Sequence, residues 1–323
     1  MHTRREFAKT LLPALAASAA LAQASRRFSN RIQGVRIGAI TYSYRSLKDP
    51  SAPYSAAEVD RLVDRLVAAF QEDEIDCAEF WIGMIEPPRP GGPHPNPSDP
   101  AARIGREALR QWRKERPLEI FRRARRKFED AGVEIYSAMY NFDDACTDDE
   151  LDCAFDMANA LGTSRITANC TVKSIRRVAP FADKHRTIVA AHGEIMPGDP
   201  ELDGMVFADN LAAALNLSPY IWTAPDIGHM TRYGQDVVKF VRDCHLRIST
   251  LHLKEGLKNH PEFHNDHNTP EWGQGNVPFR ELLQLVKNER YPFPAMIEYE
   301  YAGKGTAVQE VRRCLDFCRA MLA

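Results

Sequence analysis

The sequence lacks several features that would each point to a class of protein. Its 42 lysines and arginines nearly match its 44 aspartates and glutamates, which gives a formal net charge of −2. Because nucleic-acid-binding proteins usually present a basic face, this balance argues against nucleic acid as a partner. After the first 24 residues, no apolar run is long enough to span a bilayer. The sequence also has neither a Walker loop nor a nucleophile elbow.

A disulfide framework is also missing. The chain has seven cysteines, an odd number, and their positions show no paired spacing. Cys314 and Cys318 lie four residues apart in a segment with helical periodicity, so we expect them to pack against apolar neighbours. We therefore assign the cysteines no function.

The first 24 residues have the pattern of an export signal. A paired-arginine segment, Thr3-Arg-Arg-Glu-Phe7, precedes a short alanine-rich apolar run that ends at Ala22-Gln-Ala24. This pattern predicts a twin-arginine signal cleaved after Ala24, and the run is too short for a membrane anchor. The signal carries Arg4, Arg5 and Lys9 against Glu6, a charge of +2, so its removal changes the net charge from −2 to about −4. We expect a periplasmic or secreted protein of residues 25–323.

Short apolar and β-branched runs alternate with helical patterns along the mature chain. A capping box, Ser55-Ala-Ala-Glu58, begins a helix whose apolar face continues to Phe70. Further helices are predicted at 118–131, 149–161, 237–244, 277–288 and 308–321. Strands are predicted at 35–41, 77–82, 133–139, 164–170, 187–191, 220–224, 248–253 and 295–299. Eight strands that alternate with helices predict a single-domain α/β fold, the (β/α)8 TIM barrel.

Two segments interrupt this alternation. The proline-rich stretch 86–100 follows the second strand and cannot form helix or sheet, so we interpret it as a solvated loop. The alternative is a cover over the barrel mouth, because loops after strands lie on that rim. A second loop holds His260, His264, Asp266 and His267, and we favour a solvated loop there over a second metal site.

Hard acids and imidazoles lie at the ends of the last three strands. Alternation along the seventh strand predicts that His252 and Lys254 point into the barrel, and along the eighth that Glu298 and Glu300 do. A carboxylate inside a barrel is costly unless it is paired or bound to a cation. Together with Asp226, after the sixth strand, His252 and Glu298 form a typical ligand set for a divalent metal.

The C-terminal segment resembles a known family. Asp226-Ile-Gly-His229, Leu251-His-Leu-Lys-Glu255, the Gly273-Gln-Gly275 turn and Ile297-Glu-Tyr-Glu300 are similar to the signature of the xylose isomerase-like sugar phosphate isomerases and epimerases. The resemblance covers residues 34–323, although only 222–301 are specific. It implies one Mn²⁺, Mg²⁺, Co²⁺ or Zn²⁺ held by Glu, Asp, His and Glu. Asp226, His252 and Glu298 take the last three places, and the resemblance implies that His229 and Lys254 contact substrate oxygens.

The first ligand of that set is missing. Where the family commonly ends its fifth strand with Glu-Asn-His, this chain has Ala190-Ala-His192. Three outcomes are open: His192 becomes the fourth ligand and a base, Glu194 reaches back, or the metal is lost. We favour His192, because imidazole suits Mn²⁺ and Zn²⁺ and accepts a proton near neutral pH. The alternative role for His192 is a hydrogen bond to the substrate.

Other strand ends carry candidate substrate-binding residues. Glu79 lies near the end of the second strand, where family members often carry a glutamate that contacts the substrate or the rim. Tyr42 and Asn169 follow other strands, and Trp272 could stack on a sugar face, although aromatic residues more often pack in the core.

These patterns together predict a metal-dependent enzyme that removes a proton beside the carbonyl of an unphosphorylated sugar or keto-sugar. Glu298, His192, His229 and Lys254 are the predicted catalytic residues. Because Ala190 removes one of the two bases of an epimerase, a lyase or hydratase acting on a keto-glycoside is an alternative. A non-catalytic carbohydrate-binding barrel is another. The sequence leaves the oligomeric state open.

Overall fold

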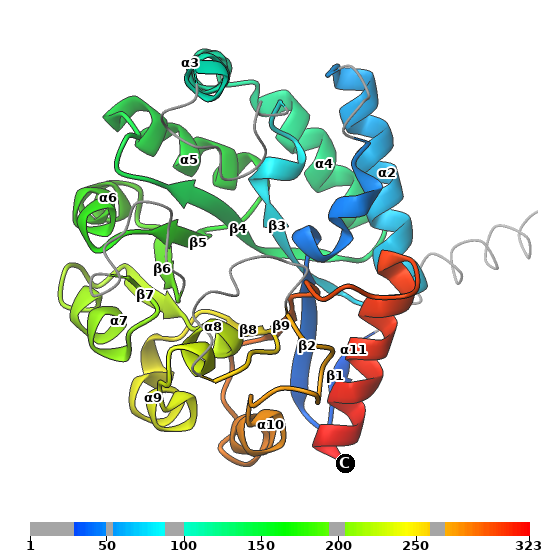
Figure 1. The fold of residues 1–323 in the computed structure, drawn as a ribbon. Helices are drawn as coiled ribbons and strands as arrows, with labels where there is room; N and C mark the ends of the chain where they lie inside the picture. Colours follow the sequence, from blue (N-terminus) through cyan, green and yellow to red (C-terminus); the bar gives the residue numbers. More distant parts are fainter. Residues whose placement is uncertain (1–28, 50–53, 88–99, 194–203, 259–268) are drawn as a thin grey trace, which may run out of the picture.

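Eight parallel strands form a nearly closed barrel with helices around it, which confirms the predicted TIM barrel (Figure 1). The computed structural model describes residues 29–49, 54–87, 100–193, 204–258 and 269–323. Hydrogen bonding orders the strands β7-β6-β5-β4-β3-β2-β9-β8. Two isolated bridges, Thr223 to Ile248 and Asp226 to His252, join the β7 and β8 sides and complete the ring.

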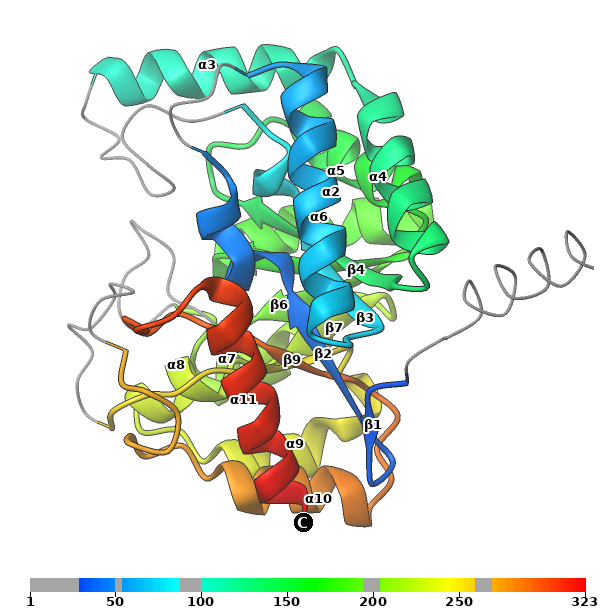
Figure 2. The ribbon, with the colours of Figure 1, turned by 90° about the vertical axis from the view of Figure 1, so that its right-hand side faces the viewer.

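All eight predicted strands are present, with ends shifted by a few residues. The barrel strands are β2 (Val35–Ile40), β3 (Cys77–Trp81), β4 (Glu134–Phe142), β5 (Arg165–Cys170), β6 (Ile188–His192), β7 (Ile221–Ala224), β8 (Leu251–Leu253) and β9 (Ala295–Ile297). A two-residue strand, β1 (Arg31–Ile32), pairs antiparallel with β2 and was not predicted. Figure 2 shows β1 at one end of the barrel and α8, which follows β7, at the other. The carboxyl ends of the strands therefore lie on the α8 side.

The helices form the outer layer. They are α2 (Ala56–Glu72), α3 (Pro100–Lys114), α4 (Leu118–Asp130), α5 (Asp148–Ala160), α6 (Val172–His185), α7 (Ala208–Ala214), α8 (Ile227–Arg232), α9 (Val237–Cys244), α10 (Phe279–Asn288) and α11 (Ala307–Leu322), with short 3₁₀ turns η1 (Thr41–Leu47), η2 (Ile82–Met84) and η3 (His245–Arg247). The predicted cap is confirmed, because Ser55 Oγ accepts a hydrogen bond from the Glu58 backbone N–H at 3.2 Å. Leu62, Leu66 and Phe70 of α2 are buried as their spacing predicts.

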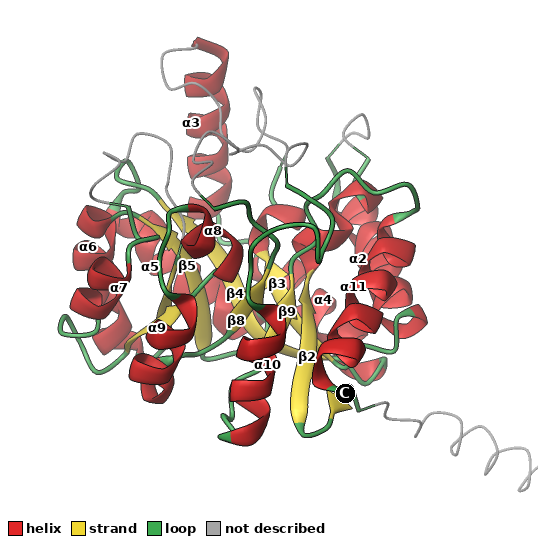
Figure 3. Cartoon of the chain, turned by 60° about the horizontal axis from the view of Figure 1, so that its bottom comes forward, coloured by secondary structure: helices red, strands yellow, loops and turns green. Residues whose placement is uncertain are grey.

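Helix α3 is the main addition to the predicted barrel. It begins at Pro100, where the proline-rich segment ends, and Figure 3 shows it rising above the rest of the described chain. Residues 88–99 lie outside the described residues, so neither interpretation of the proline-rich segment is tested. The same is true of the twin-arginine segment, of Glu194 and of the loop with His260, His264, Asp266 and His267.

All seven cysteines carry free thiols, which agrees with the absence of a disulfide framework in the sequence. Six of them are buried, and Cys244 is half-buried. Within the described ranges, none of the helices has both the length and the apolar character needed to cross a bilayer.

Candidate active site

Backbone pairing brings the ends of β7, β8 and β9 to the same level of the barrel. The His252 N–H donates to the Pro225 carbonyl at 3.0 Å, and the Glu298 N–H donates to the Leu253 carbonyl at 2.9 Å. The side chains of His252 and Glu298 meet inside the barrel, with His252 Nδ1 2.8 Å from Glu298 Oε2. This contact confirms the inward orientation that the alternation predicts for both residues.

Four buried side chains from successive strand ends converge there. We call His192, Asp226, His252 and Glu298 the ligand cluster; each offers one donor atom, and these atoms all lie within 4.8 Å of one another. His192 lies at the end of β6, two residues after the buried Ala190. The structure therefore places His192 together with Asp226, His252 and Glu298.

Asp226 divides its two oxygens between the fold and the cluster. As the N-cap of α8, it accepts a hydrogen bond on Oδ1 from the His229 backbone N–H at 2.8 Å. Its Oδ2 is buried and accepts no well-directed hydrogen bond within the described part of the chain, although Lys254 Nζ lies 3.3 Å away and His192 Nε2 3.6 Å away. The Lys254 charge compensates this buried oxygen, but no donor makes a well-directed hydrogen bond to it, so its lone pairs are suited to a metal ligand.

Lys254 lies beside the ligand cluster and is almost fully buried. Its ammonium contacts Glu300 Oε2 at 2.7 Å, His229 Nε2 at 2.9 Å and Glu298 Oε1 at 3.1 Å. Because an ammonium has donors and no acceptor, His229 Nε2 is the acceptor in its contact, and the ring proton of a neutral His229 resides on Nδ1. The predicted grouping of His229 and Lys254 at one rim is thus found.

A glycine allows the close approach that brings His229 to Lys254. A Cβ added at Gly228, in the first turn of α8, would lie 2.8 Å from the carbonyl oxygens of Lys254 and Glu255. Only glycine lets the backbone of α8 pack this closely on the end of β8. His229, the next residue, therefore reaches the Lys254 ammonium directly.

The charges of the cluster keep its carboxylates ionised. Burial alone would raise the pKa of Glu298, but the Lys254 ammonium and the hydrogen bond from His252 lower it to about 2. Burial acts in the same way on Asp226, and the Lys254 ammonium, 3.3 Å from Oδ2, holds its pKa well below the usual value. For His252, burial would lower the pKa, yet the Glu79 charge and the hydrogen bond to Glu298 raise it well above the usual value.

Glu79 lies on the other side of the His252 ring. Its Oε1 is 2.7 Å from His252 Nε2, in a contact closer to an ion pair than to a well-directed hydrogen bond. Its Oε2 accepts hydrogen bonds from Ser137 Oγ at 2.6 Å and from Thr167 Oγ1 at 2.5 Å. The side chain is fully buried, so both oxygens of this predicted substrate-binding residue are engaged inside the barrel.

Two other predicted substrate-binding residues lie where β2 and β5 end. The Tyr42 ring packs edge-on against Trp81, with centroids 4.9 Å apart, and the Arg45 guanidinium lies 4.8 Å from its centre. Asn169 Nδ2 donates to Asn141 Oδ1 at 3.0 Å. Trp81 and Asn141 were not predicted from the sequence to lie beside these residues. The available signal was alternation, because Trp81 lies two residues after the inward Glu79 and shares its face.

Trp272 packs elsewhere. Its ring stacks on Phe279 of α10, with centroids 4.9 Å apart, and meets Phe317 of α11 edge-on. Two aromatic partners from the helical layer therefore cover the ring, and the structure does not bring it to the ligand cluster. Its stacking on a sugar stays a prediction.

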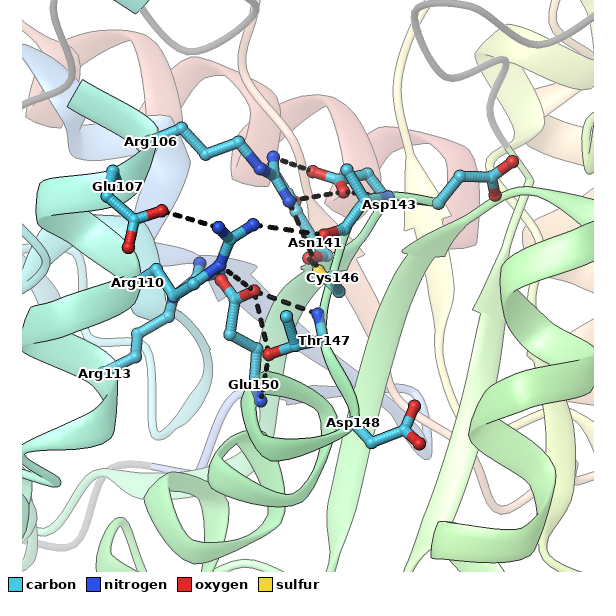
Figure 4. Close-up of polar contacts among 12 residues, drawn as sticks. Arg106, Glu107, Arg110, Arg113, Asn141, Asp143, Cys146, Thr147, Asp148 and Glu150 are labelled. Atoms are coloured by element: carbon cyan, nitrogen blue, oxygen red, sulfur yellow. Dashed lines mark hydrogen bonds and ion pairs between the residues drawn. The ribbon is translucent and has the colours of Figure 1, made fainter. Parts of the chain in front are cut away.

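A second group of charged side chains fixes α3 to the barrel (Figure 4). We call Arg106, Arg110 and Arg113 the arginine ladder, because they project from one side of α3 toward the ends of β4 and α5. Arg106 holds both oxygens of Asp143, at 2.6 and 2.7 Å, and Arg110 Nε donates to Glu150 at 3.0 Å. Arg113 is 3% exposed and joins Glu86 at 2.7 Å to Glu150 at 3.1 Å. In this group each carboxylate has a guanidinium partner.

Comparisons with known proteins agree with this fold. The family described as "Xylose isomerase-like TIM barrel" matches residues 101–321. A search of curated proteins finds no match. Among solved structures, the probable 3-DHS dehydratase AsbF from Bacillus anthracis is 14% identical, with a TM-score of 0.57 over 88% of this chain and 97% of that one.

Two sugar epimerases are similar to the same extent. The 3-keto-D-glucoside 4-epimerase YcjR from E. coli is 12% identical, with a TM-score of 0.56 over 88% of this chain and 98% of that one. The D-allulose 3-epimerase from Methylomonas sp. is 15% identical, with a TM-score of 0.56 over 89% and 98%. At these identities the likeness establishes the fold alone.

Proposed function

This chain belongs to the xylose isomerase-like TIM barrel family, and we propose that it is a metal-dependent enzyme acting on an unphosphorylated sugar or keto-sugar. The observation that carries the proposal is the ligand cluster, in which two imidazoles and two carboxylates converge within 4.8 Å inside the barrel. Mixed nitrogen and oxygen donors of this kind suit Mn²⁺, Co²⁺ or Zn²⁺. The sugar epimerases among the similar structures support the substrate class.

Asp226, His252, Glu298 and His192 are the residues that would hold the metal. Asp226 offers Oδ2, which the N-cap hydrogen bond leaves available, and His252 offers Nδ1, which faces Glu298. A bound divalent metal would polarise the substrate carbonyl and thereby acidify the neighbouring C–H bond. Metal binding and proton transfer are then tasks for different residues.

His229 and Lys254 are the best-placed pair for the proton transfer. A general base works best when its pKa is near the operating pH, and the pKa of Glu298, about 2, is far below that range. His229 lies outside the ligand cluster, so its role in proton transfer would not compete with metal binding. Nε2 holds the one lone pair of a neutral His229 and already accepts from the Lys254 ammonium at 2.9 Å, so the imidazole would take up a substrate proton only after Lys254 has passed on its own proton or moved away.

A lyase or hydratase is the second candidate, and Ala190 favours it. An epimerase removes a proton from one face of a carbon and returns one to the other face, which requires two acid–base groups. Ala190 is buried and has no ionisable group at the position where the family carries a glutamate. An elimination needs one base together with the metal, so it tolerates this change.

Metal content is the first test of the proposed function. The purified, folded protein is analysed for Mn, Co and Zn beside an Asp226→Ala/Glu298→Ala variant. An Asp64→Ala/Glu129→Ala variant, which removes two exposed carboxylates from the helical layer, serves as the matched control. Near-stoichiometric metal in the wild type and the control, lost in the cluster variant, is the expected result. Trace metal in all three proteins would contradict the metal-dependent enzyme and favour the alternative of a non-catalytic carbohydrate-binding barrel.

The reaction itself is tested in deuterated water. A panel of keto-sugars and keto-glycosides is incubated with the metal-loaded enzyme and followed by NMR. Deuterium at the carbon beside the carbonyl, with the carbon skeleton and substituents intact, would indicate an isomerase or epimerase. Loss of water or of the glycosidic substituent would indicate the lyase. Absence of both, in a protein that binds metal, would contradict proton abstraction.

We also propose that residues 1–24 direct export by the twin-arginine route. The motif is Thr3-Arg-Arg-Glu-Phe7, and export of a folded protein suits a site that must be loaded with metal. An Arg4→Lys/Arg5→Lys variant should accumulate uncleaved in the cytoplasm, whereas the wild type is recovered from the periplasm or the medium. Equal export of both proteins would contradict this route.

A further inference from the structure

We propose that Glu79 is a positioning residue, which orients the His252 imidazole so that Nδ1 is presented as a metal ligand. The inference rests on the proposed function, because it concerns the same metal site. It assigns Glu79 a role on the far side of the ring from the ligands, in place of the predicted contact with substrate.

The placement of Glu79 supports this role. His252 lies between two carboxylates, with Glu298 Oε2 2.8 Å from Nδ1 and Glu79 Oε1 2.7 Å from Nε2. Glu298 belongs to the ligand cluster, and Glu79 does not. The Nδ1 side of the ring therefore faces the prospective metal, and the Nε2 side faces a carboxylate outside the cluster.

Two hydroxyl groups hold Glu79 in this position. Ser137 on β4 and Thr167 on β5 both donate to Oε2, which leaves Oε1 directed at His252. Glu79 is fully buried, as are Ser137 and Thr167, so these donors are protected from competing water. A buried acid with three partners on three strands costs less to ionise than an isolated one.

The consequence for metal binding follows from the proton on the ring. A neutral imidazole carries one proton, and the carboxylate of Glu79 favours that proton on Nε2. Without metal, Nδ1 donates its proton to Glu298 Oε2; a metal ion would displace that proton while Glu79 keeps the proton on Nε2, so that Nδ1 becomes the ligand atom. Carboxylates that contact the second nitrogen of a metal-bound histidine typically change metal affinity by roughly 10–100-fold when they are removed.

The test measures Co²⁺ binding by the full chain. Glu79→Met removes the carboxylate at similar volume, and Glu79→Gln retains one oxygen that can still accept from Nε2. Ser137→Ala/Thr167→Val keeps the carboxylate and removes its support. We expect the Co²⁺ dissociation constant to rise roughly 10–100-fold in Glu79→Met, with a change in the visible Co²⁺ spectrum, and to rise less in the other two.

Glu150→Gln is the matched control, because it alters another buried carboxylate, in the arginine ladder. It should affect stability without altering the Co²⁺ constant or spectrum. If Glu79→Met does not fold, the Ser137→Ala/Thr167→Val variant decides, and a Co²⁺ constant and spectrum identical to those of the wild type would overturn the proposal.

A metal-free readout separates this inference from the proposed function. In the apo protein, ¹⁵N NMR of the His252 ring should show a proton on Nε2, and Glu79→Met should change the Nε2 signal. A wild type that binds no Co²⁺ but shows this dependence would refute the metal site while retaining the positioning contact. An Nε2 signal that is unchanged in the variant would refute the positioning role itself.

Discussion

The ligand cluster and the arginine ladder are both built from buried charges, but their charges are balanced in different ways. In the ladder, three guanidinium groups face Asp143, Glu150 and Glu86, and the contacts are short and multiple. Around the cluster, Asp226, Glu298, Glu79 and Glu300 share one lysine and three histidines. In the ladder each carboxylate has a guanidinium partner, although Arg106 Nε has no acceptor among the described residues, whereas the cluster has a carboxylate oxygen, Asp226 Oδ2, with no well-directed donor there.

This difference suggests different roles for the two groups: the ladder stabilises the fold, and the ligand cluster can accept a cation. A guanidinium matches a carboxylate in shape and stays charged, so a paired arginine leaves little capacity for another cation. Imidazoles and a single ammonium satisfy carboxylates less completely, and imidazole nitrogens are metal ligands themselves. Incomplete pairing, together with the imidazoles, is therefore the feature on which the proposal of a metal site at the cluster depends.

The largest expected difference is in how the two regions respond to metal. Excess Mn²⁺ should stabilise the wild type by about 4 kcal/mol when its concentration is about 1,000 times the dissociation constant. Glu150→Gln in the ladder should retain this increment, whereas Asp226→Asn in the cluster should lose most of it. Urea unfolding with and without MnCl₂ measures the increment in each variant. The same increment in all three proteins would mean that Mn²⁺ binds outside the cluster.

An effect of similar size concerns the buried end of the ladder. Arg113→Met leaves Glu86 and Glu150 buried without their shared partner, so the free energy of unfolding should fall by about 3–5 kcal/mol. The control is Arg122→Met, whose exposed ion pair with Glu119 should contribute less than about 1 kcal/mol. Adding Glu86→Gln to Arg113→Met should recover part of the loss. A loss as small as that of the control would show that Arg113 does not compensate these carboxylates.

The sequence predicted the cluster better than the ladder, for physical reasons. Strand alternation has a period of two, so the inward orientation of His252 and Glu298 could be derived from the sequence. Glu79 was identified, but its partners Ser137 and Thr167 lie 58 and 88 residues away, and a register shift between Ala78 and Glu79 sets the pairing. Contacts of this kind depend on how the barrel closes and leave no local pattern.

The ladder was missed because its residues have a common surface pattern. Arginines at positions 106, 110 and 113 follow helical spacing, as they would on any solvated helix face. Apart from Glu107, which pairs with Arg110 within the helix, their acidic partners lie 27 to 40 residues away, beyond the range of helical pairing rules. The helix also begins within a proline-rich segment, where the prolines argued against regular structure.

Asp73 provides an intermediate case, a buried carboxylate with incomplete pairing and no neighbouring ligand cluster. Tyr44 donates to its Oδ2 at 2.8 Å, and Arg312 lies 3.3 Å from Oδ1. Burial outweighs both partners and raises the pKa of Asp73 from 3.8 to about 6. Because the folded state binds this proton more tightly, the stabilising contribution is complete below about pH 4 and is lost as the pH rises through 6.

Asp73→Asn should therefore change the pH dependence of stability. The ionised aspartate costs about 2 kcal/mol at pH 7 relative to pH 4, and asparagine, which still accepts from Tyr44, has no such cost. When the pH rises from 4 to 7, the free energy of unfolding of Asp73→Asn should therefore increase by this amount relative to that of the wild type. Urea unfolding at both values measures the shift. If the variant and the wild type differed in unfolding free energy by the same amount at pH 4 and at pH 7, Asp73 would have the same pKa in the folded and the unfolded chain.

The smallest expected effect is at the outer end of the ladder. Arg106 and Asp143 form a bidentate pair (Figure 4), unlike the single contacts of Arg113 with Glu86 and Glu150, but their side chains are 30% and 31% exposed. Solvent screens such a pair, so Arg106→Ala should lower the free energy of unfolding by about 1 kcal/mol or less. The loss should shrink further in 1 M NaCl, where the screening length is about 3 Å, whereas the loss from Arg113→Met should barely change. Unfolding of both variants at low and high salt tests this contrast. If salt weakened both effects equally, burial would not be what separates the inner pair from the outer one.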